Sequence, residues 1–424
     1  MQNNMKKKSF VNLNYKPHKD DIIATYRIES KLSLEKAAVE VAAESSIGTW
    51  TKLSTLNQKT FNRLAPQIFY IDKKKKIVHI AYPIEDFELG SIPQLLSALA
   101  GNIFSMKIID NLRLEDLSLS TKYINSFQGP YYGINGVRKL MNIYERPLIG
   151  SIIKPKVGLN SKQHAKLAYD VWISGVDVVK DDENLTDMSF NKFKDRVIEV
   201  MKLKNKAEKE TGQKKIHVFN ITAPMDIMLE RAKFVKSHGG KCIMVDLVSV
   251  GLDNVQVLRR ANLGLIIHGH RAGHSMFTRN PRHGMSMLVI AKLARLSGID
   301  QLHTGTVVGK MDGSAEEVMK INKSLKEDFG INKVLRENWA KIKPTFPIAS
   351  GGLYPGLTKK LIDILGTDLI INYGGGIHGH PNGSSAGAKA CYQSVELAID
   401  KKIKIDKNKF KEYLEAQKYW KNKK

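Results

Sequence analysis

The sequence feature that most constrains this chain is a regular alternation of strand-like apolar runs and helical patterns, which begins at Pro147. Eight apolar runs follow one another, and each is followed by a stretch long enough for a helix. They are LIGSIIK, VDVVK, IHVFNIT, CIMVDL, GLIIH, QLHTG, FPIAS and DLIINYG. Eight strand-then-helix units within about 250 residues are typical of a (β/α)8 barrel, the TIM barrel. We predict this α/β fold for residues 130–400.

The segment before the barrel has a mixed rhythm. DIIATYRIE has the pattern of a strand, and QIFYI with KIVHIAYP has the pattern of a hairpin. SLEKAAVEVAAES, opened by Ser33, and SIPQLLSALAGNIF have the pattern of helices. These elements predict a small α+β domain of the ferredoxin-like type over residues 1–129. Residues 401–424 carry ten lysines and are predicted as a separate lysine-rich tail.

Composition argues against several classes of protein. The chain has 424 residues and is 42% hydrophobic, which suffices for a large core. No apolar run approaches the roughly 18 residues of a membrane helix, and the basic residues 1–8 are not followed by the apolar core of a signal peptide. Cys242 and Cys391 lie far apart, so neither a disulfide framework nor a cysteine metal cluster is supported. We expect a cytoplasmic protein without membrane contact.

The net charge of +25 raises the question of a nucleic-acid partner. The excess is mostly lysine spread along the chain, with runs at residues 73–76 and in the tail. Arginines interleaved with aromatic residues, which single-stranded nucleic acids favour, do not occur. A solvated lysine surface is therefore favoured and no nucleic-acid partner is expected, with polyanion binding or attraction of an anionic substrate as the alternative.

If the barrel prediction holds, the chemistry should lie just after the strands, where the βα loops form one face. The junctions after strands 1, 2, 5, 6, 7 and 8 are indeed rich in polar residues and glycine. In order they contain KPK, KDDE, HGHRAGH, HTG leading into VVGKMDG, SGG and GGG. The sequence therefore places a candidate site at this face.

The KDDE junction suggests a metal site. Residues i and i+2 of a strand face the same way, so Lys180 and Asp182 can converge while Glu183 reaches in from the turn. Carboxylates without cysteine favour a hard cation such as Mg2+. A protonated lysine would repel that cation, whereas a neutral lysine can react with CO2 to form a carbamate, a third anionic ligand. Taken alone, the stretch could equally be a charged surface turn.

Two glycine junctions suggest phosphate binding. SGGL at 350–353 and GGG at 374–376 follow strands 7 and 8, where barrels bind phosphate through backbone N–H groups. Lys154 and Lys156 leave strand 1 on the other side. Lys310 lies on a glycine-flanked loop, the pattern of a lid that delivers a cation to a closed site. Each feature taken singly could be an ordinary turn or an exposed lysine.

The strand 5 junction holds His268, His270, Arg271 and His274. An HxH pair is a common zinc pattern, and amidohydrolase barrels combine it with a carbamylated lysine. In those barrels the pair lies on strand 1 and the lysine on strand 4, whereas here they lie on strands 5 and 2. Arg271 suits a phosphate or carboxylate better. Phosphate-binding sites on two sides of a metal imply a substrate that is phosphorylated at both ends. The cation beside the carbonyl and hydroxyl oxygens of this substrate would make an enediolate accessible.

Nine motifs carry a family resemblance over almost the whole chain. They are AAESSIGTW (42–50), GNIF (101–104), IKPKVG (153–158), GVDVVKDDEN (175–184), HGHRAGH (268–274), RHGM (282–285), HTGTVVGKMDG (303–313), ASGG (349–352) and GGGIHGHP (374–381). In this order they resemble the large subunit of ribulose-1,5-bisphosphate carboxylase/oxygenase (RuBisCO). The spellings HGHRA, FTRNP and DENLT are most similar to the archaeal, form III branch.

The resemblance implies a lyase that adds CO2, or O2, to ribulose 1,5-bisphosphate and yields 3-phosphoglycerate. It implies that CO2 activates Lys180 as a carbamate, and that Asp182 and Glu183 complete the Mg2+ ligands. Further catalytic residues would be Lys154, Lys156, His270, Lys310, Glu44 and Asn102. Substrate contacts would be Thr49, Trp50, Arg271, His303, Ser350, Gly351, Gly352, Gly374 and Gly375.

The resemblance also bears on assembly and setting. In the family the N-terminal domain, here with Glu44, Thr49, Trp50 and Asn102, completes the site of the neighbouring subunit. It thus implies a homodimer or an assembly of dimers, without a small subunit. The archaeal branch implies a role in nucleotide (AMP) ribose salvage.

Two alternatives stay open at this stage. RuBisCO-like enolases or isomerases, acting on a phosphorylated ketose or on diketo-methylthiopentyl phosphate, share the metal triad, although they usually vary the Asn102, Lys310 and Glu44 positions. A basic polyanion-binding protein is the second alternative. The chain departs from the family pattern at Ile47, Asn372, Ile377 and His378, which puts the detail of the phosphate loops in doubt.

Overall fold

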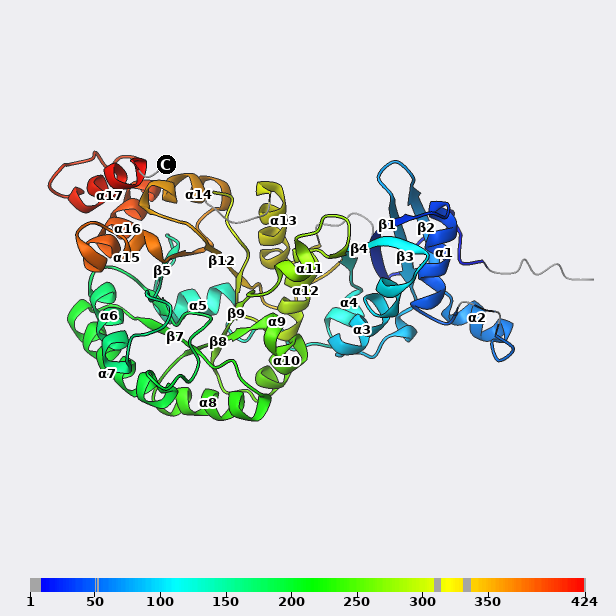
Figure 1. Cartoon of the computed structure of the whole chain (residues 1–424), viewed down its shortest axis with the longest axis horizontal. Helices are drawn as coiled ribbons and strands as arrows, with labels where there is room; N and C mark the ends of the chain where they lie inside the picture. The colour runs from blue at the N-terminus through cyan, green and yellow to red at the C-terminus, as the bar shows by residue number, and fades with distance from the viewer. Residues whose placement is uncertain (1–8, 50, 52, 309–313, 331–336, 423–424) are drawn as a thin grey trace, which may run out of the picture. The chain divides into compact units, whose positions relative to one another are not determined.

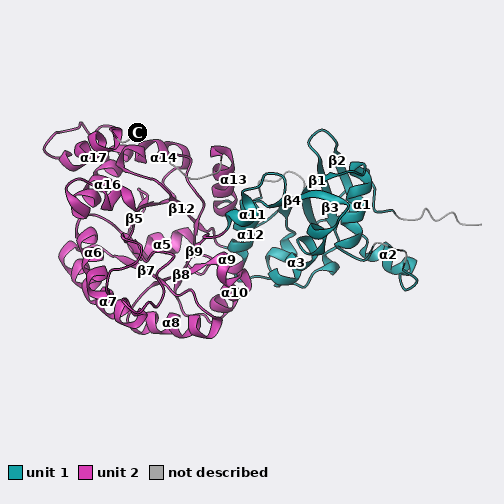
Figure 2. Cartoon of the chain, viewed as in Figure 1, with its two compact units in different colours: residues 1–128, 274–296, 327–342 teal, residues 129–273, 297–326, 343–424 magenta. Residues whose placement is uncertain are grey.

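The computed structural model describes residues 9–49, 51, 53–308, 314–330 and 337–422. The chain forms two compact units (Figure 2). Unit 1 holds residues 1–128, 274–296 and 327–342, and unit 2 holds residues 129–273, 297–326 and 343–424. Unit 1 thus contains the first part of the chain and two segments from its second half, residues 274–296 and 327–342. The domain boundaries at residues 129 and 400 stay predictions.

Unit 2 is a parallel barrel. Within its described residues, eight strands close in the order β11-β12-β13-β5-β6-β7-β8-β9. Their bounds are β5 (Leu148–Ile152), β6 (Val178–Lys180), β7 (Ile216–Asn220), β8 (Cys242–Asp246), β9 (Ile266–His270), β11 (Gln301–His303), β12 (Phe346–Ser350) and β13 (Ile370–Tyr373). Each predicted apolar run overlaps one of these strands, so the (β/α)8 prediction is confirmed.

Helices surround the strands of unit 2 (Figure 1). They are α5 (Gly133–Met141), α6 (Ser161–Ile173), α7 (Phe193–Thr211), α8 (Met225–Ser237), α9 (Leu247–Val250), α10 (Leu252–Arg260), α13 (Ala315–Lys326), η3 (Pro355–Leu357), α14 (Thr358–Leu365), α15 (Gly375–His378), α16 (Gly383–Ile399) and α17 (Lys411–Lys421). Local signals fix their ends. Asn160 and Gln163 form a capping box at the start of α6, and Gly212 ends α7 in the left-handed conformation.

The barrel core is apolar at the amino ends of the strands. There Leu148, Val178, Ile216 and their neighbours pack against Val137 and Met141 of α5. Alternate strand residues face the same side, so the residues two positions further along also point into the barrel. Toward the carboxyl ends these inward residues become polar, which prepares that face for a site.

Unit 1 is built on a five-stranded sheet, within its described residues, in the order β10-β4-β1-β3-β2. Its elements are β1 (Ile22–Ser30), α1 (Leu34–Glu44), α2 (Gln58–Leu64), β2 (Gln67–Asp72), β3 (Ile77–Tyr82), η1 (Ile84–Asp86), α3 (Ile92–Leu99), η2 (Asn102–Ser105), β4 (Ile109–Ser118), α4 (Thr121–Ile124), α11 (Ser275–Thr278), β10 (Gly284–Met285) and α12 (Met287–Ser297). Four antiparallel strands and two helices in the order βαββαβ match the predicted ferredoxin-like arrangement.

Pattern reasoning missed one strand of the fold and did not foresee how the tail packs. The strand β4 pairs with β1 in the centre of the sheet, but its charged residues obscure the alternation. The tail was predicted as a separate part, yet α17 packs on α16 and η3. Phe410, at its start, is fully buried, and Trp420 stacks on Tyr354 with ring centroids 5.7 Å apart.

The pair Gly150 and Asn372 generates a stability prediction. The two residues are partners on β5 and β13, and a Cβ on Gly150 would lie 2.2 Å from Asn372 Oδ1. Gly150→Ala should lower the free energy of unfolding by about 1–3 kcal/mol through overpacking. Adding Asn372→Ala should restore most of that loss, measured by urea unfolding. A double variant no more stable than Gly150→Ala would contradict this packing.

Candidate active site

Lys180 is the last residue of β6 and lies fully buried inside the barrel. Its Nζ donates to the carbonyl oxygen of Asp181 at 2.8 Å and lies 3.7 Å from Glu183 Oε2. Burial lowers the pKa of Lys180, and the carboxylates of Glu183 and Asp182 offset only part of that effect. The lowered pKa increases the fraction of neutral amine, the form that can act as a nucleophile.

The two carboxylates that follow are held by lysines. Lys154 Nζ donates to Asp182 Oδ2 at 2.6 Å, and Lys156 Nζ donates to Glu183 Oε1 at 3.2 Å. Burial alone would raise the pKa of Glu183, but the charges of Lys180, His270 and Lys156 outweigh it and hold the pKa at about 2. Glu183 is therefore an anion at neutral pH, with lysines from two junctions around it.

Histidines form the neighbouring wall. His270 Nδ1 lies 3.2 Å from Asp246 Oδ1, and His270 Nε2 lies 3.6 Å from Glu183 Oε2. The His268 and His303 Nε2 atoms are 2.8 Å apart, so one ring donates to the other. Burial holds the pKa of both His268 and His303 well below the usual value, which keeps these two rings neutral.

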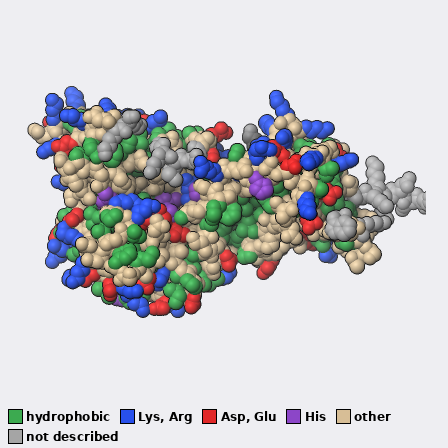
Figure 3. All heavy atoms as spheres, viewed as in Figure 1, with side chains coloured by type: hydrophobic (Ala, Val, Ile, Leu, Met, Phe, Trp, Pro, Cys, Tyr) green, Lys and Arg blue, Asp and Glu red, His purple; other side chains and the backbone are tan. Residues whose placement is uncertain are grey.

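The glycine junctions lie on the adjacent strands. Gly351 and Gly352 follow β12 with φ of 120° and 69°, values that glycine adopts readily. Gly374 and Gly375 follow β13, and a Cβ on Gly374 would lie 3.4 Å from Lys154 Cε. The loop after β13 therefore sits beside the lysine that pairs with Asp182. Figure 3 shows histidine, basic (Lys or Arg) and acidic side chains gathered around the centre of the barrel unit's visible face.

Arg271 follows β9, beside the β11 junction. A Cβ on Gly305 would lie 2.7 Å from Arg271 Nη2, so glycine at 305 leaves room for the guanidinium. Burial lowers the pKa of Arg271 to about 10, with Glu317 opposing the shift. The group is thus a cation at neutral pH, close to His303, whose pKa its charge helps to lower.

The predicted residues fall into two groups. The structure brings Lys154, Lys156, Lys180, Asp182, Glu183 and His270 together, with Arg271 and His303 on one side. Ser350 ends strand β12, and Gly351, Gly352, Gly374 and Gly375 follow strands β12 and β13. Glu44, Thr49 and Asn102 lie in unit 1, where they line a cavity of about 380 Å³. Trp50 and Lys310 lie outside the described residues.

Two residues of the site were missed at the sequence level. Asn220 ends β7, and its Nδ2 donates to the carbonyl oxygens of Asp182 and Glu183 at 3.3 and 3.0 Å. Asp246 ends β8 beside His270. Each is the polar residue that closes a largely apolar run, IHVFN and CIMVD, and that position was the available signal.

Among the described residues, one group of three metal-ligating side chains has converging ligand atoms: His164, Asp181 and His217. It does not include the HxH pair, whose His268 is bonded to His303 and Gln301. In the same described part of the chain, no helix is long and apolar enough to cross a membrane.

Family models match both parts of the chain. Residues 133–420 match the catalytic domain of the ribulose bisphosphate carboxylase large chain, and residues 9–123 match its N-terminal domain. The chain belongs to the ribulose bisphosphate carboxylase large-chain family. The predicted family and the predicted enzyme class, a carboxylase, are thereby confirmed.

Archaeal members of this family are similar over nearly the whole chain. Ribulose bisphosphate carboxylase of Methanosarcina mazei is 47% identical over 93% of this chain and 94% of that protein. The Methanocaldococcus jannaschii protein of the same name is 45% identical over 97% of this chain and 100% of its own length.

Solved archaeal structures agree. Octameric Rubisco from Pyrococcus horikoshii, in complex with sulfate, superposes with a TM-score of 0.91 at 43% identity, covering 98% of this chain and 97% of that one. Dimeric Rubisco from Hyperthermus butylicus gives a TM-score of 0.90 at 42% identity, covering 97% and 98%. The predicted similarity to archaeal members is confirmed.

One departure from the RuBisCO pattern has a clear structural setting. His378 ends α15, just behind the glycine loop. Its Nε2 lies 3.2 Å from Ser151 Oγ on β5, and its Nδ1 lies 3.0 Å from Ser384 Oγ on α16. Burial lowers the pKa of His378 to about 4, although a bond to the Ile152 backbone opposes this. The neutral ring therefore ties the loop to the first strand.

This burial predicts a pH dependence of stability. Between the folded pKa of about 4 and the unfolded value of 6.5, the unfolded chain binds more protons at His378, so stability falls as the pH falls through that window. The slope from one such group is at most about 1.4 kcal/mol per pH unit. His378→Leu should lose less stability than the wild type between pH 6.5 and 4.5, measured by urea unfolding.

The exposed His238 supplies the control for this measurement. His238→Leu should follow the wild-type pH dependence. If His378→Leu loses as much stability as the wild type between pH 6.5 and 4.5, His378 is not buried in the neutral form.

Proposed function

We propose that the chain catalyses the Mg2+-dependent addition of CO2, or of O2 as a side reaction, to the enediolate of ribulose 1,5-bisphosphate. Carboxylation would yield two molecules of 3-phosphoglycerate. The observation that carries the proposal is Lys180, a buried lysine with a lowered pKa, 3.7 Å from Glu183 and next to Asp182. A charged surface turn would have no reason to bury this amine completely.

The residues at the end of β6 fit the metal. The neutral Lys180 amine would attack CO2, forming an N–C bond and releasing a proton, and the resulting carbamate oxygen would join the carboxylates of Asp182 and Glu183. An all-oxygen, anionic set of ligands suits Mg2+. When bound, Mg2+ would lower the pKa of the C3 proton of the substrate and stabilise the enediolate charge.

The surrounding groups would handle protons and charge. The Lys180 carbamate, or a group near it, would take the C3 proton. Lys154, now paired with Asp182, would deliver the last proton to the product once the metal satisfies that carboxylate. Lys156 would hold Glu183 in place, and His270 would act in hydration and cleavage. Lys310 would close over the site and stabilise the new carboxylate.

Two anion sites would hold the substrate ends. Backbone N–H groups near Gly351, Gly352, Gly374 and Gly375, with Ser350, would bind one side, because glycine lets a phosphate approach closely. Arg271 and His303 would bind the opposite side. Glu44, Thr49, Trp50 and Asn102 would complete the site of a neighbouring subunit.

The assembly and setting follow the relatives. The solved archaeal structures are dimeric and octameric, which supports a homodimer or an assembly of dimers. We expect no small subunit. We infer a cytoplasmic enzyme of nucleotide (AMP) ribose salvage. No observation in the described residues favours the enolase or polyanion-binding alternatives, and both become outcomes of the first test below.

The first test is a labelled fixation assay. After incubation with bicarbonate and Mg2+, the wild type should convert ribulose 1,5-bisphosphate and labelled CO2 to an acid-stable product. Lys180→Ala should lower the rate by a factor on the order of 10³, because it removes a metal ligand.

Lys215 is a matched control, because it is also buried and burial lowers its pKa to about 8, but it lies at the amino end of β7. Lys215→Met should keep most of the activity. No fixed label with the wild type would refute the proposal. Proton exchange without fixation would support the enolase alternative, and salt-sensitive polyanion binding unaffected by Lys180→Ala would support the other.

The C-terminal helix generates a second test. Trp420 stacks on Tyr354, which follows the β12 loop. Trp420 also lies close to Gly379, which follows the β13 loop, since a Cβ on Gly379 would lie 3.3 Å from the Trp420 ring. His380 Nε2 also lies 3.1 Å from the Glu412 carbonyl oxygen. Because α17 supports both glycine loops, Trp420→Ala should raise the KM for the bisphosphate several-fold with little change in kcat. The exposed Lys418→Ala serves as control, and an unchanged KM in Trp420→Ala would contradict the support.

A further inference from the structure

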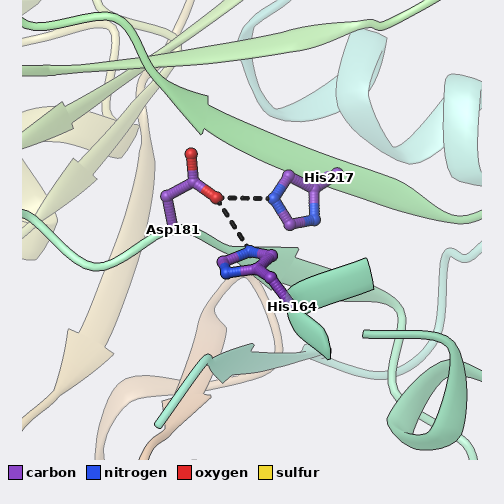
Figure 4. Close-up of side chains that lie close together, drawn as sticks. All are labelled: His164, Asp181 and His217. Carbon is purple, nitrogen blue, oxygen red and sulfur yellow. Dashed lines mark hydrogen bonds and ion pairs between the residues drawn. The ribbon is translucent and has the colours of Figure 1, made fainter. Parts of the chain in front are cut away.

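Asp181 points away from the active site. Because strand residues alternate, Lys180 and Asp182 face into the barrel while the Asp181 side chain faces the helices outside. Figure 4 shows its carboxylate between His164, on α6, and His217, on β7. All three residues are buried, and Asp181 is 0% exposed.

The carboxylate is fully engaged by groups of its own chain. Arg196 Nε, from α7, donates to Asp181 Oδ2 at 3.0 Å, and the Asn220 backbone N–H donates to the same oxygen at 3.0 Å. His217 Nε2 lies 2.8 Å and His164 Nε2 lies 3.1 Å from Oδ1.

This group does not form a second metal site. Its ligand atoms lie within 4.8 Å of one another, as a metal would require. However, the guanidinium of Arg196 already neutralises the carboxylate, and a divalent ion beside that buried cation would be repelled. Arg196 is itself fixed, since it also donates to the carbonyl oxygens of Asn191 and Thr186. The cluster is therefore an anchor between the strand and helices α6 and α7.

The anchor connects to the metal ligands through the backbone. The Asp181 carbonyl oxygen accepts the hydrogen bond from Lys180 Nζ at 2.8 Å. The backbone N–H of Asp181 donates to the carbonyl oxygen of Val218 at 3.1 Å. Asn220, whose N–H binds the Asp181 carboxylate, uses its side chain to hold the carbonyl oxygens of Asp182 and Glu183. The side chain that faces outward is thus connected through hydrogen bonds to the backbone of residues 180–183.

We propose that Asp181, clamped by Arg196, is a positioning residue that holds Lys180, Asp182 and Glu183 in the arrangement required for uptake of CO2 and Mg2+. The inference rests on the proposed function. It assigns Asp181 to activation of the site and not to the steps on the substrate, which it does not touch. Loss of the anchor should weaken activation while leaving the activated site able to turn over.

The same strand segment offers a matched control. Asp177, at the amino end of β6, is also 0% exposed and pairs with an arginine, Arg146, through two bonds of 2.6 and 2.9 Å. It also accepts from the Ile149 backbone N–H at 2.8 Å. Asp177→Asn therefore removes a comparable buried ion pair from the opposite end of the strand, without touching residues 180–183.

The experiment compares Asp181→Asn with Asp177→Asn in the full chain. The carbamate is observed by ¹³C NMR with ¹³C-labelled CO2 during a Mg2+ titration, alongside the Tm and the kcat at saturating CO2 and Mg2+. Asp181→Asn should need about tenfold more Mg2+ for half of the carbamate signal, with kcat within about threefold of the wild type. Asp177→Asn should lower the Tm but leave the titration midpoint unchanged.

The outcomes separate the two proposals. Equal midpoints for Asp181→Asn, Asp177→Asn and the wild type would overturn the positioning role while leaving the proposed function intact. A wild type without carbamate signal or fixation would refute the proposed function and the positioning role with it. If Asp181→Asn does not fold, Arg196→Lys, which keeps the charge but loses the fork of bonds, should shift the midpoint in the same direction. An unshifted midpoint there would overturn the proposal.

Discussion

The site depends on one constraint, the complete burial of the Lys180 amine at the end of a barrel strand. A protonated amine is costly to bury, and the neighbouring carboxylates compensate for this burial only in part. The balance leaves a buried amine that can lose its proton beside the carboxylates of Asp182 and Glu183. Lys154 and Lys156 then pair with the carboxylates, so no charge in this cluster is isolated. The histidines and the glycine loops of the catalytic face surround this cluster.

Residues on both faces of the short strand β6 and at its end hold Lys180 in this buried position. Its inward residues change from apolar Val178 to Lys180, so the same strand contributes to the core and to the site. Its outward side carries the Asp181 anchor, which ties it to two helices. A strand of three residues has few ladder hydrogen bonds to define its end. Side-chain contacts on both faces take over that task.

Much of the fold was predictable because burial imposes simple patterns on a parallel barrel. Strands covered on both faces are continuous apolar runs, and polar residues after them mark the catalytic face. The strand β4 was missed because its charged residues break the alternation of apolar and polar positions. The packing of α17 was missed because ten lysines in the tail suggested a solvated segment.

The candidate site was predictable only in part. The motifs around Lys180, His270 and Gly374 were visible because each combines several reactive or glycine residues in a short stretch. Asn220 and Asp246 were not, because one polar residue after a strand is ordinary and its partners come from other strands. The Asp181 cluster contains residues from α6, α7 and β7 and from the end of β6. Such a cluster forms only in the tertiary structure, so a local sequence pattern does not reveal it.

The order of strands around the barrel has a consequence for biosynthesis. The first barrel strand, β5, hydrogen-bonds to the last one, β13, so the ring cannot close until more than two hundred further residues have been made. Such long-range pairing is slow, and incomplete chains expose strand edges to other molecules. The polar groups around Lys180 would meet bulk water throughout that interval. Translation speed and chaperone access over the second half of the chain should therefore govern how much protein reaches its closed form.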